Sequence, residues 1–270
     1  MTHHPLPAPA PPGQRQHPNP PGPGTGPVIG RALQILGAFT AQHSHLSLSD
    51  LARRAGLPVS TVHRMLGELL AWGALERDAQ GRYRVGLRLW EVGVLAPRTQ
   101  GLRERALPHL EALSALTREN VQLAVRDGSE VVFVEHIRAG GAVPTLTRVG
   151  GRLAVTASAA GLVLLAHAPA PVQDDVLRVP IRRHTDFTLT DSTLLRRVLA
   201  QVRTYGYSVS DRQLSVDTLS VAAPVTTAAG EAAAAVSVVV RHGSTSVGTL
   251  ADLVRRTGRA ISRALDPSVA

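Results

Sequence analysis

The sequence predicts an α+β protein with two structural units. The first unit would contain three short helices and a small β-hairpin, because apolar residues recur at helical spacing between residues 28 and 72 and an alternating stretch follows them. The second would be built on a mostly antiparallel sheet, because strand-like stretches come in pairs after residue 120 with helical stretches around them. A chain of 270 residues is long enough for both cores.

Residues 1–27 are dominated by Pro and Gly and contain almost nothing that a core could bury, so we expect a disordered tail. Order should begin at Val28. From there a helix is expected to run to about Gln42, with apolar residues at offsets of three and four. These residues are Ile29, Ala32, Leu33, Leu36 and Phe39.

Ser47 predicts the start of a second helix, because Asp50 follows it three residues later as in a capping box. Gly56 supplies the left-handed residue that ends it, and Leu57–Pro58 form a turn. The third helix should run from about Val59 to Trp72. Its apolar side is expected to be buried, which leaves short polar side chains and an arginine on the other side. These are Ser60, Thr61, His63 and Arg64.

A hairpin is predicted next, with residues 75–77 and 82–85 flanking the turn at 78–81. Two helices joined by a sharp turn and followed by a two-stranded wing form a winged helix-turn-helix, here residues 28–86. Such a unit places its second helix of the pair in the major groove of DNA. We therefore expect base contacts from Ser60, Thr61, His63 and Arg64. Contacts to phosphates, or to the minor groove at the wing, are expected from Arg53, Arg54, Arg77, Arg82 and Arg84.

Three alternatives stay open for this unit. A winged helix can bind protein, a helical bundle can carry ordinary solvated arginines, and a basic protein can bind DNA without reading its sequence. The formal charge of +9 favours a polyanionic partner, with nucleic acid first among the candidates. All the basic residues are arginine, which a genome rich in G and C explains without any functional role.

Residues 87–101 are expected to form a linker. "GLRLWEVGVL" is too apolar on all sides for a helix alone in water, so it should pack between the units or against the same helix of a second subunit. Two-fold pairing would suit a palindromic DNA site. The chain lacks cysteine and any apolar run of membrane length, and we expect a cytoplasmic protein with no membrane partner.

Residues 102–266 are expected to form the second unit. A helix should follow Leu102 and kink or restart at Pro108. Further helices are predicted at residues 157–167, 192–205 and 249–265. Strands are predicted at residues 121–126, 131–137, 207–211, 219–225 and 232–240.

Taken in order, these motifs resemble the IclR family of bacterial transcriptional regulators. The matching stretches are "GRALQIL", "LSDLARRAGLPVSTVHRML", "GRYRVGLRLWEVG", "VQLAV", "RVGGRL", "ASAAGLVLLA", "GYSVSD" and "VAAPV". The resemblance implies a linker helix that dimerises and a C-terminal effector-binding domain with a GAF/PAS-like α+β fold. It also implies a homodimer or dimer of dimers that represses or activates transcription in response to small organic or aromatic acids.

The resemblance also implies an effector pocket. Carried over residue by residue, the pocket would use the turn at Ala159 and Ala160 as a backbone donor. Side-chain contacts would come from Ser210, Ser220 and Ser237, with Asp211 as the neighbouring carboxylate.

Several positions depart from the family pattern. Thr156 stands where members often have His, Leu162 where they have Lys, and Ser210 where an Asp is common; Val238 to Arg241 replace part of a Ser-x-Ser-Gly-Pro motif. Each departure removes a charge or a hydroxyl, so we hypothesise an effector less polar than a small keto acid. The alternative is a closed, vestigial pocket.

No catalytic role is expected. Ser237, His242 and Asp211 could be drawn as a triad, but triads are defined by geometry, and the chain has no nucleophile elbow or phosphate loop. The histidines at 136, 167, 184 and 242 lack the close spacing of metal ligands. We therefore expect neither a metal nor another cofactor.

Overall fold

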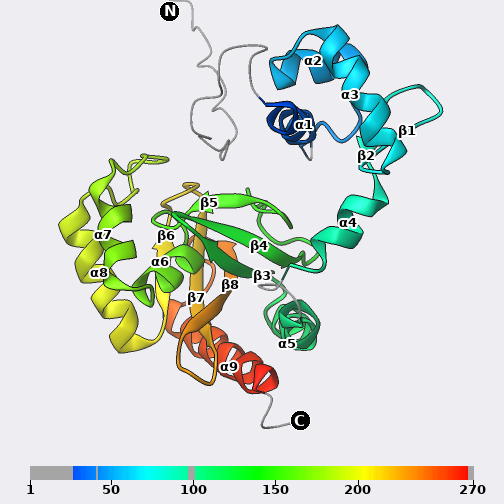
Figure 1. Ribbon diagram of the computed structural model, residues 1–270. Coiled ribbons are helices and arrows are strands. Elements are labelled where there is room, and N and C mark those ends of the chain that lie inside the picture. Colours follow the sequence, from blue (N-terminus) through cyan, green and yellow to red (C-terminus); the bar gives the residue numbers. More distant parts are fainter. Residues whose placement is uncertain (1–26, 41, 97–100, 267–270) are drawn as a thin grey trace, which may run out of the picture. The chain divides into compact units, whose positions relative to one another are not determined.

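The computed structural model describes residues 27–40, 42–96 and 101–266 (Figure 1). The chain divides into two compact units, and the described residues 27–96 and 101–266 fall into different ones. Residues 1–26 of the expected tail and residues 97–100 of the expected linker lie outside the described residues.

The first unit is a winged helix-turn-helix. Its elements are α1 (Val28–Gly37), α2 (Leu48–Ala55), α3 (Val59–Ala71), β1 (Leu75–Arg77), β2 (Tyr83–Val85) and α4 (Leu87–Gly93). The two strands pair antiparallel, and Tyr83 also bridges to Leu46 ahead of α2, which ties the wing to the helices. The core includes Ile35, Leu51 and Leu66, one buried residue from each of the three helices.

The turn between α2 and α3 follows the signals in the sequence. The hydroxyl of Ser47 accepts a hydrogen bond from the N–H of Asp50 at 3.2 Å and caps α2. Gly56 takes the left-handed conformation, with φ at 67°, and ends the helix. These two residues confirm the predicted boundaries of the helix that precedes the turn.

The predicted end of the first helix was wrong, because α1 ends at Gly37 and not near Gln42. The carbonyl of Ala38 accepts a hydrogen bond from Nε of Arg54 at 2.8 Å. Thr40 and His43 then pair with each other through their backbones. The carbonyl group left free at the end of α1 is therefore satisfied by a hydrogen bond from a residue of α2. Apolar spacing alone does not reveal such a contact.

The second unit is an α+β domain on one six-stranded sheet. Its helices are α5 (Leu102–Thr117), α6 (Ala159–Ala166), α7 (Ala170–Arg178), α8 (Ser192–Tyr205) and α9 (Val247–Leu265). Its strands are β3 (Asn120–Asp127), β4 (Glu130–Ile137), β5 (Arg152–Ala154), β6 (Ser208–Asp211), β7 (Thr218–Thr226) and β8 (Ala232–Arg241). The strand order is β5-β4-β3-β8-β7-β6, and every neighbouring pair is antiparallel.

All five predicted strands and all four predicted helices of this unit are confirmed, with shifts of up to two residues at their ends. Pro108 lies inside α5, which continues through it. Two elements of this unit, α7 and β5, were not predicted from the sequence. Pro171 stands at the second position of α7, where the missing N–H costs nothing, so a Pro-rich stretch begins a helix here. β5 has three residues, too few for an alternating pattern.

The two faces of the sheet have different partners. α5 and α9 cover one face, over Val221, Val236 and Val238, and α6 covers the other with α7 and α8 outside it (Figure 1). Successive side chains of a strand point to opposite faces, so each strand contributes to both layers. No helix in the described part of the chain is long and apolar enough to cross a membrane.

Gly258 marks the closest approach of α9 to the sheet, since a Cβ atom there would lie 2.5 Å from the carbonyl oxygen of Pro224. We expect Gly258→Ala to destabilise the protein by about 1–3 kcal/mol through overpacking, even though alanine favours helix by ~1 kcal/mol. Gly248→Ala, in the same helix with open space around it, should leave stability unchanged or slightly higher. Urea unfolding of both variants checks this, and equal midpoints would contradict it.

Candidate functional site

The outward face of α3 is the candidate surface for nucleic acid. Val62, Met65 and Leu66 are buried, which turns the other side of the helix to solvent. Ser60, His63 and Arg64 are exposed and Thr61 is half-buried. Within the described residues, none of these four side chains forms a hydrogen bond or an ion pair, so all four are free to contact a partner.

The arginines of α2 have partners within the protein. Arg53 pairs with Asp50 at 2.8 Å on the surface. Arg54 is half-buried, and its Nε donates to the carbonyl of Ala38, so part of its guanidinium group holds the end of α1. Arg53 therefore remains available for phosphate at the cost of a surface ion pair, which solvent screens and which contributes little to stability.

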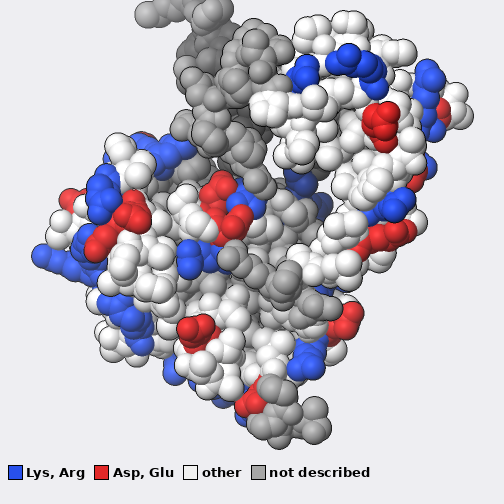
Figure 2. Space-filling model, viewed as in Figure 1, with Lys and Arg blue, Asp and Glu red and all other residues white. Residues whose placement is uncertain are grey.

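The arginines of the wing are also paired. Arg82 contacts Asp78 at 3.0 Å, and Arg84 contacts Glu76 at 2.7 Å. Arg77 donates to the carbonyl of Gly81 and lies over the ring of Tyr83. Figure 2 shows basic side chains over α2, and basic beside acidic ones near the β1–β2 turn. Among the predicted DNA-binding arginines, Arg64 is the one without a partner in the described residues.

A cavity of ≈ 530 Å³, counting the space at its mouth, lies in the second unit against the sheet face that α6 covers. Neighbouring strands bring polar side chains together on this face. Ser210 on β6 is paired with Ser220 on β7, and Gln122 on β3 is paired with Ser237 on β8. All four residues line the cavity.

The N-terminus of α6 forms another part of the wall. Ser158 caps the helix by accepting from the N–H of Gly161 at 3.0 Å, and Ala160 lines the cavity. The N–H of Ala160 has no hydrogen-bond partner among the described residues, as expected in the first turn of a helix. This N–H and the positive end of the helix dipole favour a negatively charged group of a ligand.

The turn before α6 is fixed from two sides. The hydroxyls of Ser208 and Ser210 donate to the carbonyls of Ala159 and Ala157, at 2.6 and 3.0 Å. A Cβ atom at Gly161 would lie 2.3 Å from the carbonyl oxygen of Val155, so only glycine fits there. The free N–H of α6 is therefore held in a fixed position beside the sheet.

Residues 144–147 close the cavity on another side. The amide group of Gln122 donates to the hydroxyl of Thr147, and the amide group of Asn120 donates to the carbonyl of Val143 at 2.7 Å. His136 is paired with Gln122 across the strands. Burial lowers the pKa of His136, and the positive charge of Arg138 lowers it further. This imidazole is therefore neutral at pH 7.

The cavity wall contains no charged side chain. It consists of hydroxyl, amide and apolar groups, among them Phe133, Leu146 and Leu214. The hydroxyls of Ser220 and Ser237 form no hydrogen bond with other described residues and are available to a ligand. An acidic ligand would be met by N–H and O–H dipoles, without a cationic side chain.

Two of the predicted pocket residues do not line the cavity. Ala159 is buried behind the wall. Asp211 is paired with Leu219, which belongs to the core under α5 and α9, so alternation along β6 turns Asp211 away from Ser210. Ala160, Ser210, Ser220 and Ser237 do line the cavity.

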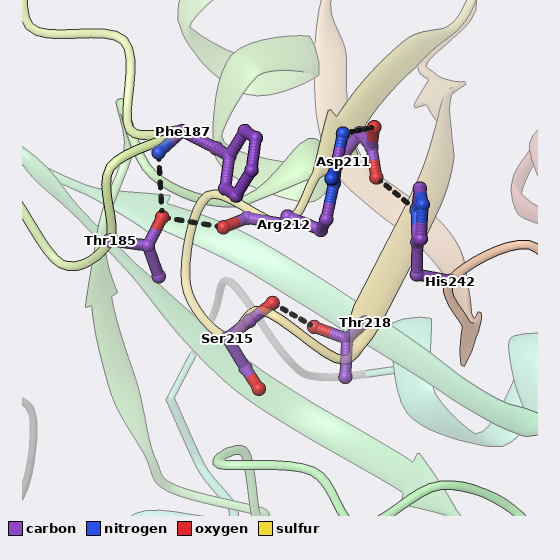
Figure 3. A network of polar contacts seen from close by, with 7 residues as sticks. All are labelled: Thr185, Phe187, Asp211, Arg212, Ser215, Thr218 and His242. Atoms are coloured by element: carbon purple, nitrogen blue, oxygen red, sulfur yellow. Dashed lines mark hydrogen bonds and ion pairs between the residues drawn. The ribbon is translucent and has the colours of Figure 1, made fainter.

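Asp211 takes part in a different network (Figure 3). Its carboxylate contacts Nδ1 of His242 at 2.7 Å and Nη2 of Arg212 at 3.4 Å, and Arg212 stacks on the ring of Phe187. Ser237 lies four residues before Arg241, the last residue of β8, so it is about 13 Å along the strand from the turn that holds His242. The Asp–His pair is therefore present, but the triad drawn from the sequence does not form.

Sequence reasoning missed Gln122, Thr147, Ser158 and the residues that follow β6, Leu214 and Ser215. A signal existed for Gln122, which is the one polar residue in the otherwise apolar stretch "VQLAV". The sequence carries no such signal for Thr147, because the position of this residue depends on how residues 138–151 fold over the sheet. No group of three residues able to hold a metal ion occurs in the described ranges.

Comparisons with known proteins cover both units. The family model described as the IclR helix-turn-helix domain matches residues 28–79, and the one described as bacterial transcriptional regulator IclR C-terminal matches residues 96–263. The chain is 34% identical to the HTH-type transcriptional regulator BhcR of Paracoccus denitrificans, over 88% of this chain and 87% of the relative. It is 30% identical to the HTH-type transcriptional repressor AllR of Escherichia coli, over 87% and 89%.

A crystal structure of an IclR homolog from Microbacterium hydrocarbonoxydans, complexed with 4-hydroxybenzoate, superposes with a TM-score of 0.84. The two chains are 36% identical, and the match covers 88% of this chain and 99% of the other. The Thermotoga maritima IclR matches with a TM-score of 0.73 at 25% identity, over 88% and 98% of the two chains. The winged unit, the two-faced sheet and these matches agree, and the chain belongs to the IclR family of DNA-binding transcriptional regulators.

Proposed function

We propose that this protein is a sequence-specific transcriptional regulator whose α3 reads an operator in the major groove. The observation that carries the proposal is the unpartnered polar face of α3, which offers Ser60, Thr61, His63 and Arg64 to base edges. Arg53, Arg54, Arg77, Arg82 and Arg84 would contact phosphates or the minor groove.

The pairing of charges favours base reading over a purely architectural role. A protein that binds DNA through charge alone needs cations free to replace the counterions of the phosphates. Here Arg82 and Arg84 of the wing are paired with Asp78 and Glu76, and Arg53 is paired with Asp50. Arg64, which contacts neither a carboxylate nor a carbonyl among the described residues, lies on the face that would meet the bases.

We also propose that the cavity binds a small-molecule effector that changes the affinity for DNA. A monocarboxylate with an aromatic or apolar body fits the wall best. The N–H of Ala160 would receive the carboxylate, the hydroxyls of Ser220 and Ser237 would contact polar substituents, and Phe133 and Leu146 would pack on the body. The related Microbacterium protein was crystallised with such an acid, 4-hydroxybenzoate. The alternative is that the cavity is vestigial and binds nothing.

The protein would act as a homodimer, or as a dimer of dimers, on a palindromic site. No residue of α4 is buried, and Leu87, Trp90 and Leu95 are each more than 60% exposed. Ile29 and Leu33 of α1 are similarly exposed. Apolar patches of this kind on a small unit mark a surface that another chain covers. Two-fold pairing would present two copies of α3 to two half-sites.

Replacing Arg64 should separate base reading from general attraction. At about 150 mM salt, we expect Arg64→Ala to weaken binding to a site selected from random DNA by about 5–150-fold, the equivalent of one lost bidentate contact. Binding to shuffled DNA should change by a few-fold at most. Arg53→Ala is the matched control and should weaken both DNAs alike. Fluorescence polarisation measures the affinity of the wild type and of both variants for each of the two DNAs. Equal losses on both DNAs for Arg64→Ala would contradict base reading by this residue.

The effector can be tested by calorimetry with three acids. 4-Hydroxybenzoate should bind at least about tenfold more tightly than pyruvate or glyoxylate, because the wall offers apolar contacts that a keto acid cannot use. Ser237→Ala should weaken binding by about 5–150-fold if its hydroxyl contacts the ligand, while Ser244→Ala, on an exposed turn, should not change it. Tight binding of pyruvate or glyoxylate would refute the less polar effector. Binding of none of the three would favour the vestigial cavity.

If the dimer pairs through α4, a charged residue introduced on this helix should separate the two subunits. Trp90→Glu should convert the dimer to a monomer in light scattering, because a carboxylate would be desolvated at the interface. Leu116→Glu changes an equally exposed apolar residue of α5 and should leave the dimer intact. A wild-type protein that is monomeric, or a Trp90→Glu variant that remains dimeric, would count against α4 as the dimer surface.

A further inference from the structure

The first turn of α4 is capped by a residue from the wing. Gly86 precedes the helix and has no side chain to cap it. Instead, Oε1 of Glu76, eleven residues earlier on β1, accepts a hydrogen bond from the N–H of Leu87 at 3.1 Å. An unsatisfied N–H at the start of a helix is thus paired with a carboxylate, which the helix dipole also favours.

The same carboxylate joins the second strand of the wing. Oε2 of Glu76 accepts from Nε and Nη2 of Arg84, at 3.0 and 2.7 Å. The N–H of Leu87 and, after it, Arg84 lower the pKa of Glu76, so this group stays ionised at neutral pH. One side chain therefore connects β1, β2 and α4.

Two further contacts hold the same turn. A Cβ atom at Gly86 would lie 2.2 Å from the carbonyl oxygen of Gly73, so the chain that enters α4 passes against the chain that leaves α3. Arg88 lies over the ring of Trp72, 4.7 Å from its centre, and donates to the carbonyl of Trp72 at 3.3 Å. The start of α4 is thus fastened both to the wing and to the C-terminal end of the recognition helix.

The rest of α4 has no such support, because none of its residues is buried in the winged unit. The direction in which α4 leaves this unit is therefore set by its first turn. In a dimer that pairs through α4, that direction fixes how far apart the two copies of α3 lie, and DNA half-sites are spaced by whole helical turns.

We infer that Glu76 is a positioning residue that sets the spacing of half-sites the dimer accepts, by fixing α4 against the wing. The inference depends on the dimer and on the sequence-specific DNA binding proposed above. Glu76 acts through α4, and no contact with a base is proposed for it. Because the Glu76 carboxylate contacts both Leu87 and Arg84, a movement of α4 would also displace the side chains of the wing.

The test uses the full-length protein and a palindromic site selected from random DNA. The two half-sites are moved apart or together by one to four base pairs, and fluorescence polarisation measures the affinity for each spacing. A single half-site serves as a reference for the recognition surface itself. The variants are Glu76→Ala, which removes both contacts, Glu76→Gln, which can still accept from Leu87, and Arg84→Ala, which removes only the ion pair.

Glu76→Ala should reduce the preference for the best spacing by about fivefold, the factor typical of a lost helix cap. The preference is the ratio of affinities for two spacings, each relative to the single half-site, so a change in half-site affinity from the release of Arg84 cancels. Glu76→Gln should restore the wild-type preference, and Arg84→Ala should weaken all spacings alike. A wild-type preference in Glu76→Ala overturns the inference, as does an equal change in Arg84→Ala. A wild-type protein without any spacing preference overturns the proposed dimer itself, and the inference with it.

Discussion

The alternation of side chains across one antiparallel sheet determines most of the second unit. Each of β3, β7 and β8 sends one set of residues into the core under α5 and α9 and the other set toward α6. Val121 and Val236 are fully buried, while Gln122 and Ser237, one position along, line a cavity. A shift of one residue in the strand pairing would move the core residues to the cavity face and the cavity residues to the core. The strand register that buries the core therefore also determines which residues line the cavity.

In the winged unit, the corresponding constraint is the pairing of charge. Most arginines of α2 and the wing contact a carboxylate or a carbonyl, and these contacts hold the end of α1, the β1–β2 turn and the start of α4. Exposed pairs of this kind contribute little to stability because solvent screens them, whereas a good bidentate contact with a base is worth about 1–3 kcal/mol of discrimination. The arginines can therefore serve structure and phosphate binding together, while α3 supplies the discrimination.

Local signals made the winged unit predictable, because Ser47, Gly56 and the hairpin turn each act within a few residues. The end of α1 was not predictable in this way, since it depends on Arg54, sixteen residues beyond Ala38. In the second unit, the resemblance led to Ala160, Ser210, Ser220 and Ser237, which line the cavity. It also named Asp211, which the strand register places on the other face, where it contacts His242. Thr147 reaches the cavity through a loop, and no pattern in the sequence specifies that contact.

The most direct test of this account is the affinity of the wild-type protein for DNA from immediately upstream of its own gene, beside a shuffled control, over a series of salt concentrations. Base reading by α3 predicts binding at least a thousandfold tighter than to the control at about 150 mM salt, where nonspecific binding has a Kd of roughly 10⁻⁴ to 10⁻⁶ M. Equal affinities with the same salt dependence on both DNAs, and on sites selected from random DNA, would contradict it and leave attraction by charge as the only mode of binding.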